Sequence, residues 1–373
     1  MINNIDKKNI FSLLIGFFYL FWIIFLINGS QIFSIIQFIL SLLILILFIQ
    51  KKDVNRRSFI FISIFTLIFI INNLINRNLN LIGIFFNLQF SFIALGLANF
   101  ELDKSTTKLF YNLHVIIFLF FMITGSDPNT IFAESSRNTI SVIMLIQTAL
   151  LYFSKYKIDK NISIIPAVIT LAISLWGVGR SGILSAFVLL LFILLSKNLR
   201  SLYKTKFKVY RIIPIIAVII AIFTFLMTNY ADDIGYYITY GLERFEQLGF
   251  EEDIRGAVIK EFFENIDSMK SLVLGPDLKE VFLINLTNNN LHNSYLRLYA
   301  YYGLLGIILF SSKVILSTKN YLKIKNHVYL GLLLAILLRI STDSVAFPGH
   351  LDPIIYFLIL NTIDEEKIHD YSV

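Results

Sequence analysis

Apolar residues form long runs along this chain, separated by short polar segments. A run of about 20 apolar residues is what an α-helix needs to cross the hydrocarbon core of a bilayer. One longer stretch, residues 230–292, departs from this pattern and is rich in charged residues. The sequence therefore predicts an all-α, polytopic integral membrane protein with one large loop and about twelve transmembrane helices, near residues 10–28, 32–50, 58–75, 81–99, 109–125, 139–154, 162–178, 181–196, 212–229, 295–312, 327–341 and 353–363.

Composition supports this class. Of the 373 residues, 57% are hydrophobic and 15% are charged, whereas about 25% of the residues in soluble domains are charged. The absence of cysteine excludes disulfides and Cys-ligated metal sites. The five histidines are scattered, so we expect neither a metal nor a cofactor. The net charge of +7 does not indicate nucleic-acid binding, because the basic residues lie in short runs between apolar stretches, where they orient a membrane protein.

The basic residues predict the orientation of the helices. With twelve spans, alternate segments hold 22 of the 32 Lys and Arg residues, which places them and both termini in the cytoplasm. The loop at 230–292 is then external and acidic, with 12 Asp and Glu against 5 Lys and Arg. We expect three parts: 1–229 with the first nine helices, the external loop 230–292, and 293–373 with three helices and a cytoplasmic tail. Within the loop, Val258, Phe262 and Ile266 predict an amphipathic helix that lies on the membrane or docks against the bundle.

Two motifs are candidates for chemistry. Leu291-His292-Asn293-Ser294-Tyr295-Leu296, followed by Gly303 and Gly306, places a histidine where the loop re-enters the membrane. A histidine there can accept a proton from an alcohol; the structural alternative is that His292 caps the helix. Gly179-Arg180-Ser181-Gly182 places an arginine among small residues at the outer end of two spans. Arginine suits forked recognition of phosphate; the alternative is an Arg180 that extends to the headgroups.

Other external cations are weaker candidates. Arg255 opens the amphipathic helix and Arg244 precedes it, and either one is a candidate to fold over the bundle or to be a solvated charge. Arg339 lies near Asp343 and Asp352 in the turn between the last two spans. Ionisable groups at membrane depth are functional candidates, although a structural Arg–Asp pair is the simpler interpretation of Arg339.

These motifs, in this order, resemble the bacterial O-antigen polymerase and O-antigen ligase family of membrane glycosyltransferases. The matching elements are Gly179–Gly182, Arg255 followed by Leu274-Gly275, and His292 through Gly306. The resemblance covers roughly residues 135–345 and implies a GT-C-like fold. Such enzymes transfer an oligosaccharide from a polyprenyl pyrophosphate carrier to an acceptor hydroxyl, at the outer face of the bacterial cytoplasmic membrane and without a metal.

The resemblance also implies roles for individual residues. We expect His292 to be the catalytic base, with Arg180 and Arg255 as catalytic cations that stabilise the departing pyrophosphate. Substrate-binding roles fall to Arg244, Asn293, Tyr295 and Arg339. The expected partners are an undecaprenyl pyrophosphate-linked oligosaccharide and membrane lipids, with a chain-length regulator protein as a further candidate and no nucleic acid. We expect a repeat-unit polymerase that builds an O-antigen or capsule.

Two alternatives remain open at this stage. The first is the ligase of the same fold, which moves a finished polymer to a terminal acceptor such as the lipopolysaccharide core; no residue separates it from a polymerase. The second is a flippase or transporter of lipid-linked oligosaccharides. Transporters often show repeated halves and broken helices, and we expect neither in this chain.

Overall fold

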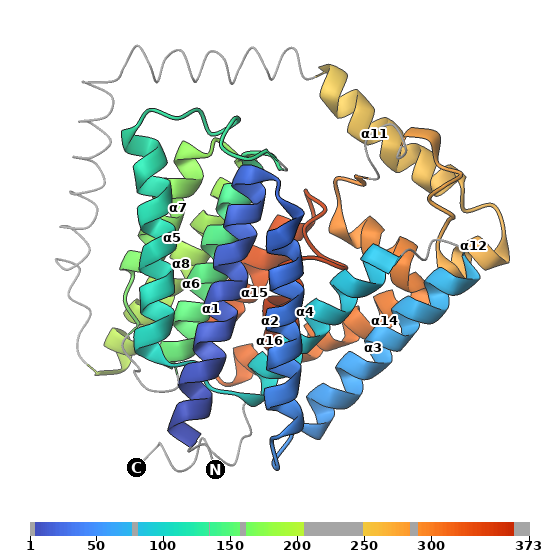
Figure 1. The fold of residues 1–373 in the computed structure, drawn as a ribbon. Coiled ribbons are helices and arrows are strands. Elements are labelled where there is room, and N and C mark those ends of the chain that lie inside the picture. The colour runs from blue at the N-terminus through green and yellow to red at the C-terminus, as the bar shows by residue number, and fades with distance from the viewer. Residues whose placement is uncertain are drawn as a thin grey trace.

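The protein is described here from a computed structural model, which covers residues 4–76, 81–133, 135–156, 162–204, 249–283 and 290–361. All regular secondary structure in these ranges is helical. The helices are α1 (Asn4–Asn28), α2 (Gln31–Ile49), α3 (Arg56–Ile75), α4 (Leu81–Asn99), α5 (Lys104–Ile123), α6 (Asn138–Tyr156), α7 (Ile165–Trp176), α8 (Arg180–Lys204), α11 (Gly249–Glu264), α12 (Met269–Leu274), α14 (Ser294–Lys323), α15 (His327–Ile340) and α16 (Asp352–Leu360) (Figure 1).

Six of the described helices are long and apolar enough to cross a membrane, namely α1 to α5 and α14. Three shorter apolar helices cover Ile165–Trp176, Arg180–Ser196 and His327–Ile340. Eleven of the predicted spans overlap a helix, although α1, α5, α8 and α14 extend beyond the predicted limits by five residues or more. The twelfth, near 212–229, lies outside the described residues. Several apolar helices are therefore present, as in a multi-pass membrane protein.

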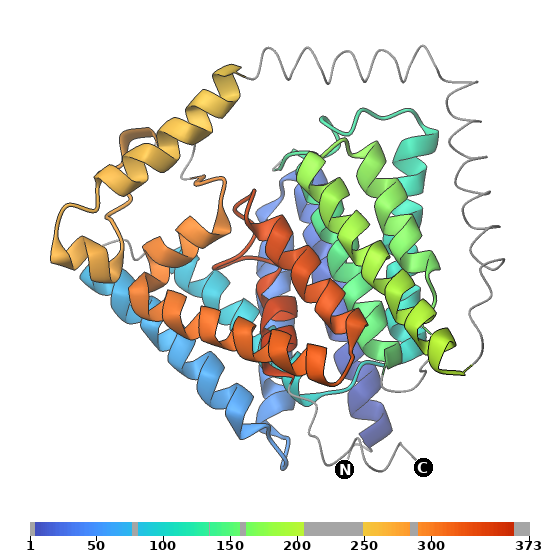
Figure 2. The same ribbon diagram turned by 180° about the vertical axis from the view of Figure 1, so that it is seen from behind.

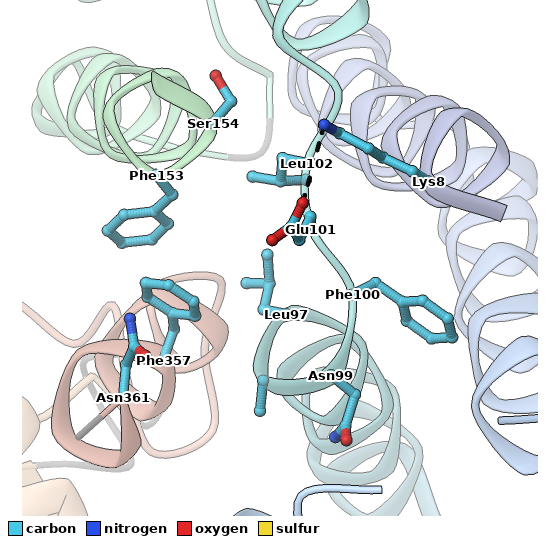
Figure 3. A pocket seen from close by; sticks show the side chains of 11 residues that line it. Lys8, Leu97, Asn99, Phe100, Glu101, Leu102, Phe153, Ser154, Phe357 and Asn361 are labelled. Carbon is cyan, nitrogen blue, oxygen red and sulfur yellow. Dashed lines mark ion pairs between the residues drawn. The ribbon is translucent and has the colours of Figure 1, made fainter. Parts of the chain in front are cut away.

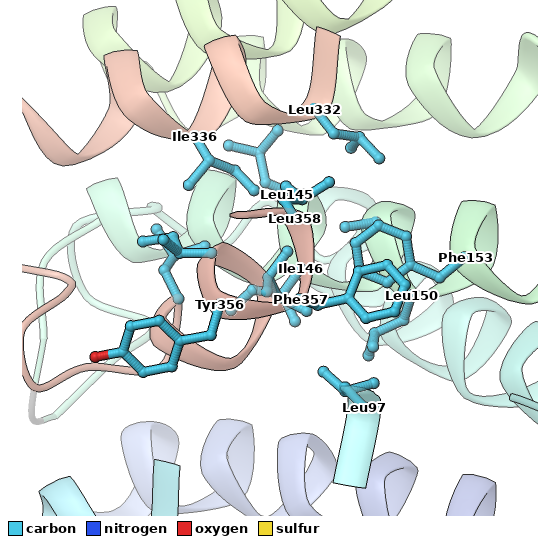
Figure 4. Packing of buried hydrophobic residues seen from close by; sticks show 14 of the residues in the cluster. Leu97, Leu145, Ile146, Leu150, Phe153, Leu332, Ile336, Tyr356, Phe357 and Leu358 are labelled. Atoms are coloured by element: carbon cyan, nitrogen blue, oxygen red, sulfur yellow. The ribbon is translucent and has the colours of Figure 1, made fainter. Parts of the chain in front are cut away.

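Burial separates the interior helix from those on the outside. Every residue of α6 from Thr139 to Ser154 is buried, which is typical of a helix that is enclosed on all sides. Figure 4 shows Leu145, Ile146, Leu150 and Phe153 of α6 packed against side chains of α15 and α16. By contrast, α2 exposes a continuous apolar stripe, formed by Ile32, Ile35, Ile39, Leu43 and Ile46. Such a stripe suits contact with lipid.

The last predicted span, near 353–363, corresponds to the short helix α16. α16 has only nine residues, about 13 Å of helix, which is too short to cross the core of a bilayer. Residues 341–351, between α15 and α16, are not helical, and Ala346, Phe347 and Leu351 among them are completely buried. Non-helical backbone inside a membrane protein must be hydrogen-bonded by its neighbours. The Asp352 carboxylate accepts the N–H groups of Phe347 and Gly349 at 2.9 and 2.8 Å.

α14 contains a break that we did not predict. Gly303 has φ 62° and ψ −170°, so the helix is interrupted after its first turns. Figures 1 and 2 show α14 beside α3, both inclined to the other helices. The interruption frees backbone carbonyls, which α3 satisfies: Asn73 donates to Tyr301 at 2.8 Å, and Asn72 donates to Ala300 at 3.4 Å. The expectation that no helix is broken is therefore wrong. Buried asparagines of α3, which is far from α14 in the sequence but beside it in space, stabilise the interruption.

The segment 230–292 contains the amphipathic helix that the sequence predicts. Val258 and Phe262 of α11 are buried, whereas Phe263 is 54% exposed. The buried side chains pack with Leu291, Tyr299 and Ala300, at the start of α14. Figure 2 shows α11 and α12 on the α3–α14 side of the molecule. Of the two arrangements considered, the structure has the helix docked against the start of α14.

Candidate functional site

The Arg180 motif begins α8 and packs against the start of α6. A Cβ atom on Gly179 would lie 2.7 Å from the Asn138 side-chain oxygen, and one on Gly182 would overlap Ser141. A larger residue would displace Asn138 or Ser141 at these positions, so the prediction that small residues allow a close approach is confirmed. The Arg180 side chain is exposed at the first position of the helix.

Arg339, at the end of α15, is fixed to the same place from inside the bundle. Its guanidinium is completely buried. It donates to the Asn138 carbonyl at 3.1 Å and forms an ion pair with Asp343 at 3.0 Å, while Nε lies 3.4 Å from the Ser141 hydroxyl. No part of Arg339 reaches the surface, which favours the structural Arg–Asp pair, and substrate binding by Arg339 stays a prediction. The structure gives it a structural role.

The turn after α15 connects this arginine to the start of α14. Ser294 donates its hydroxyl to the Asp343 carbonyl at 2.6 Å and accepts the N–H groups of Val345 and Ala346 at 3.0 and 3.2 Å. We call the connected residues Asn138, Arg339, Asp343 and Ser294 the polar bridge. The polar bridge joins the starts of α6 and α14, and α8 packs against its α6 end.

His292 lies two residues before the polar bridge and is half-buried. Its φ of 49° is unusual for a residue other than glycine, and backbone strain of this kind is commonly found at functional sites. The cap of α14 is Asn293, whose side-chain oxygen accepts the N–H groups of Tyr295 and Leu296 at 2.8 and 3.4 Å. The alternative in which His292 caps the helix is therefore wrong. Tyr295 donates its hydroxyl to the Leu337 carbonyl at 3.0 Å.

The loop cations are less completely described. The backbone of Arg255 lies in α11, three residues before Val258, which packs with Leu291 and Tyr299. The loop helix therefore brings the Arg255 backbone towards the start of α14. The Arg255 side chain and the whole of Arg244 lie outside the described residues, so the choice between these two arginines stays a prediction.

A cavity of about 220 Å³ adjoins the polar bridge. Trp22 and Phe90 contribute aromatic walls, Ser135 and Thr139 contribute hydroxyls, and Arg297 contributes a guanidinium. Neither this cavity nor a role for Arg297 was predicted from the sequence.

A second cavity, of about 80 Å³, lies near the other end of α1 (Figure 3). It is lined by Lys8, Glu101 and Asn361, and the Lys8 and Glu101 side chains approach to 4.0 Å. Trp22 and Leu26, by contrast, place the larger cavity near the carboxyl end of α1. The smaller cavity therefore lies apart from His292 and Arg180.

Comparisons with known proteins leave the family open. No protein-family model matches the chain, and no curated protein matches its sequence. Within the described ranges, no group of three or more His, Asp and Glu residues is arranged to hold a metal ion.

Proposed function

We propose that the protein is a metal-independent membrane glycosyltransferase that polymerises oligosaccharide repeat units carried on a polyprenyl pyrophosphate. The observation that carries this proposal is the polar bridge, which holds the start of α14, after His292, to the start of α6, against which α8 begins with Arg180. The proposed base and the proposed cation therefore belong to elements that the polar bridge connects. The docked helix α11 adds the Arg255 backbone to the side where α14 begins.

The proposed reaction uses these groups in one displacement. His292 removes the proton from the acceptor sugar hydroxyl, whose oxygen forms a new bond to the anomeric carbon of the donor. The bond from that carbon to the pyrophosphate oxygen breaks, and its electron pair leaves with the lipid carrier. Arg180 and Arg255 stabilise the charge that develops on the pyrophosphate, because fixed cations aimed at developing charge lower the barrier. Asn293, Tyr295 and Arg244 are proposed to contact the substrate.

The wider architecture is part of the same proposal. We propose a GT-C-like bundle of about twelve spans in the bacterial cytoplasmic membrane, with both termini in the cytoplasm and residues 230–292 outside. The positive charges of the alternate segments support this orientation. A carrier lipid would then enter sideways from the outer leaflet to reach the start of α14.

The test is the polymer made by cells that lack the native gene and carry single variants. His292→Ala is expected to abolish polymer longer than one repeat unit, since a general base contributes typically about 10²–10⁴-fold to a rate. His327→Ala is the matched control, because His327 is also half-buried but begins α15. Arg180→Ala and Arg56→Ala form a second pair, each an exposed arginine at the first position of a helix. Full-length polymer from the His292 variant would contradict the proposal.

The glycan that accumulates in a deletion strain distinguishes a polymerase from a ligase of the same fold. Loss of a polymerase leaves single repeat units on the acceptor, whereas loss of a ligase leaves unattached polymer on the carrier. The first pattern is expected here.

A transporter is a second candidate because of the break at Gly303. Transporters of several folds bind their substrates at interrupted helices, and α14 is interrupted next to buried asparagines. Purified protein incubated with lipid-linked repeat units decides between the two. Longer lipid-linked glycans are expected from a polymerase, while a transporter returns the donor at its original length.

A further inference from the structure

The cavity beside the polar bridge has one cation in its wall. The Arg297 Nη1 donates to the Ser344 carbonyl at 3.1 Å, and the guanidinium lies 5.7 Å from the centre of the Tyr301 ring. Asp352 attracts it electrostatically, but the Asp352 carboxylate accepts two backbone N–H groups. In the described part of the chain, no carboxylate lies within ion-pair distance of Arg297. The guanidinium therefore has donors left for a ligand.

The remaining wall suits a sugar ring. Trp22, Phe86 and Phe90 supply aromatic surface, Ser135 and Thr139 supply hydroxyls, and none of the described residues in the wall is acidic. Trp22 stacks on His350, with ring centres 3.8 Å apart and planes inclined by 9°, so its ring is held in place. Fixed aromatic rings beside a few polar groups are typical of ligand sites.

Size and charge restrict the ligand further. At about 220 Å³ the cavity is smaller than the roughly 300–1,000 Å³ typical of pockets for drug-sized ligands, so it accommodates one sugar residue and not a whole repeat unit. A sugar pyrophosphate esterified to a lipid carries two negative charges, but Arg297 is the only arginine or lysine among the described residues in the wall. One guanidinium instead matches the single charge of a carboxylate, which it binds through paired hydrogen bonds.

We propose that this cavity is a subsite for one acidic sugar residue, a hexuronic acid, whose carboxylate pairs with Arg297. This deepens the proposed function and rests on it, since it identifies the glycan that the enzyme handles as acidic. Arg297 contacts the substrate as a specificity-determining residue and takes no part in the proton transfer assigned to His292.

Direct binding tests the proposal without turnover. The chain has two tryptophans, so a Trp176→Phe protein reports the emission of Trp22 alone. Methyl glucuronide is expected to change this emission saturably, and methyl glucoside to bind at least about tenfold more weakly, because a hydrogen bond to a charged group contributes more than a neutral one. Equal binding of the two glycosides would overturn the proposal, as would the absence of binding by both. Tighter binding of inorganic pyrophosphate would assign the cavity to the carrier instead.

Variants of Arg297 provide the control for charge. Arg297→Gln is expected to weaken glucuronide binding by about tenfold or more while glucoside binding is unchanged, and Arg297→Lys to retain part of the preference because it keeps the charge. Arg56→Gln, an exposed arginine on α3, is expected to change nothing. If the Gln and Lys variants lost the preference equally, although both unfold at the wild-type temperature, charge recognition at Arg297 would be refuted.

His292→Ala separates this proposal from the proposed function. That variant is expected to bind methyl glucuronide normally and to make no polymer. If the wild-type protein bound methyl glucuronide but never polymerised repeat units, the glycosyltransferase would be refuted and the acidic-sugar subsite would stand. Polymerisation without any preference for acidic sugars would do the reverse.

Discussion

Replacing Asp343 by alanine should be among the most damaging substitutions outside the apolar core. It removes the carboxylate that lies 3.0 Å from a completely buried Arg339 guanidinium. Breaking a buried pair by removing one partner costs about 3–5 kcal/mol, because a buried charge is left uncompensated. The Asp343 side chain is 17% exposed, which favours the lower end. The Ser344 N–H also loses its acceptor, which adds about 1 kcal/mol. We therefore expect a loss of about 4 kcal/mol.

A double-mutant cycle shows whether this loss of stability comes from the buried Arg339 charge that is left without its partner. Arg339→Met removes the buried cation and leaves a carboxylate that water reaches, so it should cost less than Asp343→Ala. The combined variant should be more stable than Asp343→Ala alone. Unfolding in mixed micelles of a mild detergent and dodecyl sulfate, followed by tryptophan fluorescence, gives the free energies.

An exposed pair with the same spacing is the control. Lys260 and Glu264 are four residues apart on α11 and lie 3.8 Å from each other, with 78% and 62% of their side chains exposed. Exposed pairs contribute about 0–1 kcal/mol, so Lys260→Ala should leave stability almost unchanged. The reasoning would be refuted if Asp343→Ala were no more destabilising than Lys260→Ala, or if the two single costs simply added in the combined variant.

Two further substitutions test the elements around the site. Gly303→Ala should destabilise the protein by about 1–3 kcal/mol, since φ is positive there and a Cβ would lie 2.5 Å from the Val273 carbonyl oxygen. The control Gly256→Ala should leave stability unchanged, because no atom lies within 4 Å of the new Cβ. Equal stability of the two variants in the micelle titration would contradict this prediction. Phe262→Ala should release α11 and speed its hydrogen exchange, at a cost of about 3–5 kcal/mol for a buried phenylalanine. Replacing the exposed neighbour, Phe263→Ala, should leave the exchange of α11 unchanged. Unchanged exchange in both variants would show that α11 is held by other contacts.

The helices could be predicted because the membrane imposes a local rule. An apolar run of about 20 residues is recognisable without knowledge of its neighbours, and α2, α3 and α4 begin and end within two residues of the predicted limits. The rule fails where side chains of the protein hydrogen-bond buried backbone groups that are not in a helix. α16 has nine residues and the turn before it is not helical, because Asp352 and Ser294 satisfy backbone groups that a span would have bonded internally. Sequence hydropathy does not distinguish such a segment from a short span.

The site was predictable only in its local parts. The glycines beside Arg180 and the spacing of Arg339 and Asp343 are short-range signals, and the structure confirms both. The contacts that connect them span far greater distances along the chain: Arg339 donates to Asn138, 201 residues away. Arg297 was overlooked for the same reason, since its cavity is built from α1, α4, the start of α6 and the last turn. A cavity lined by residues from four distant parts of the chain leaves no recognisable pattern in any short stretch of sequence.

The break at Gly303 explains how α11 can set the position of His292. An unbroken α14 would fix its first turns through the rest of the helix, whereas the interrupted helix leaves residues 294–302 to be positioned by their neighbours. Those neighbours are the asparagines of α3, the polar bridge at Ser294, and α11, whose Phe262 packs against Tyr299 with ring centres 6.1 Å apart. α11 also contains Arg255. A displacement of α11 would therefore move the proposed cation and the proposed base together. Releasing α11 should accordingly reduce polymerisation even in a protein whose other helices stay folded.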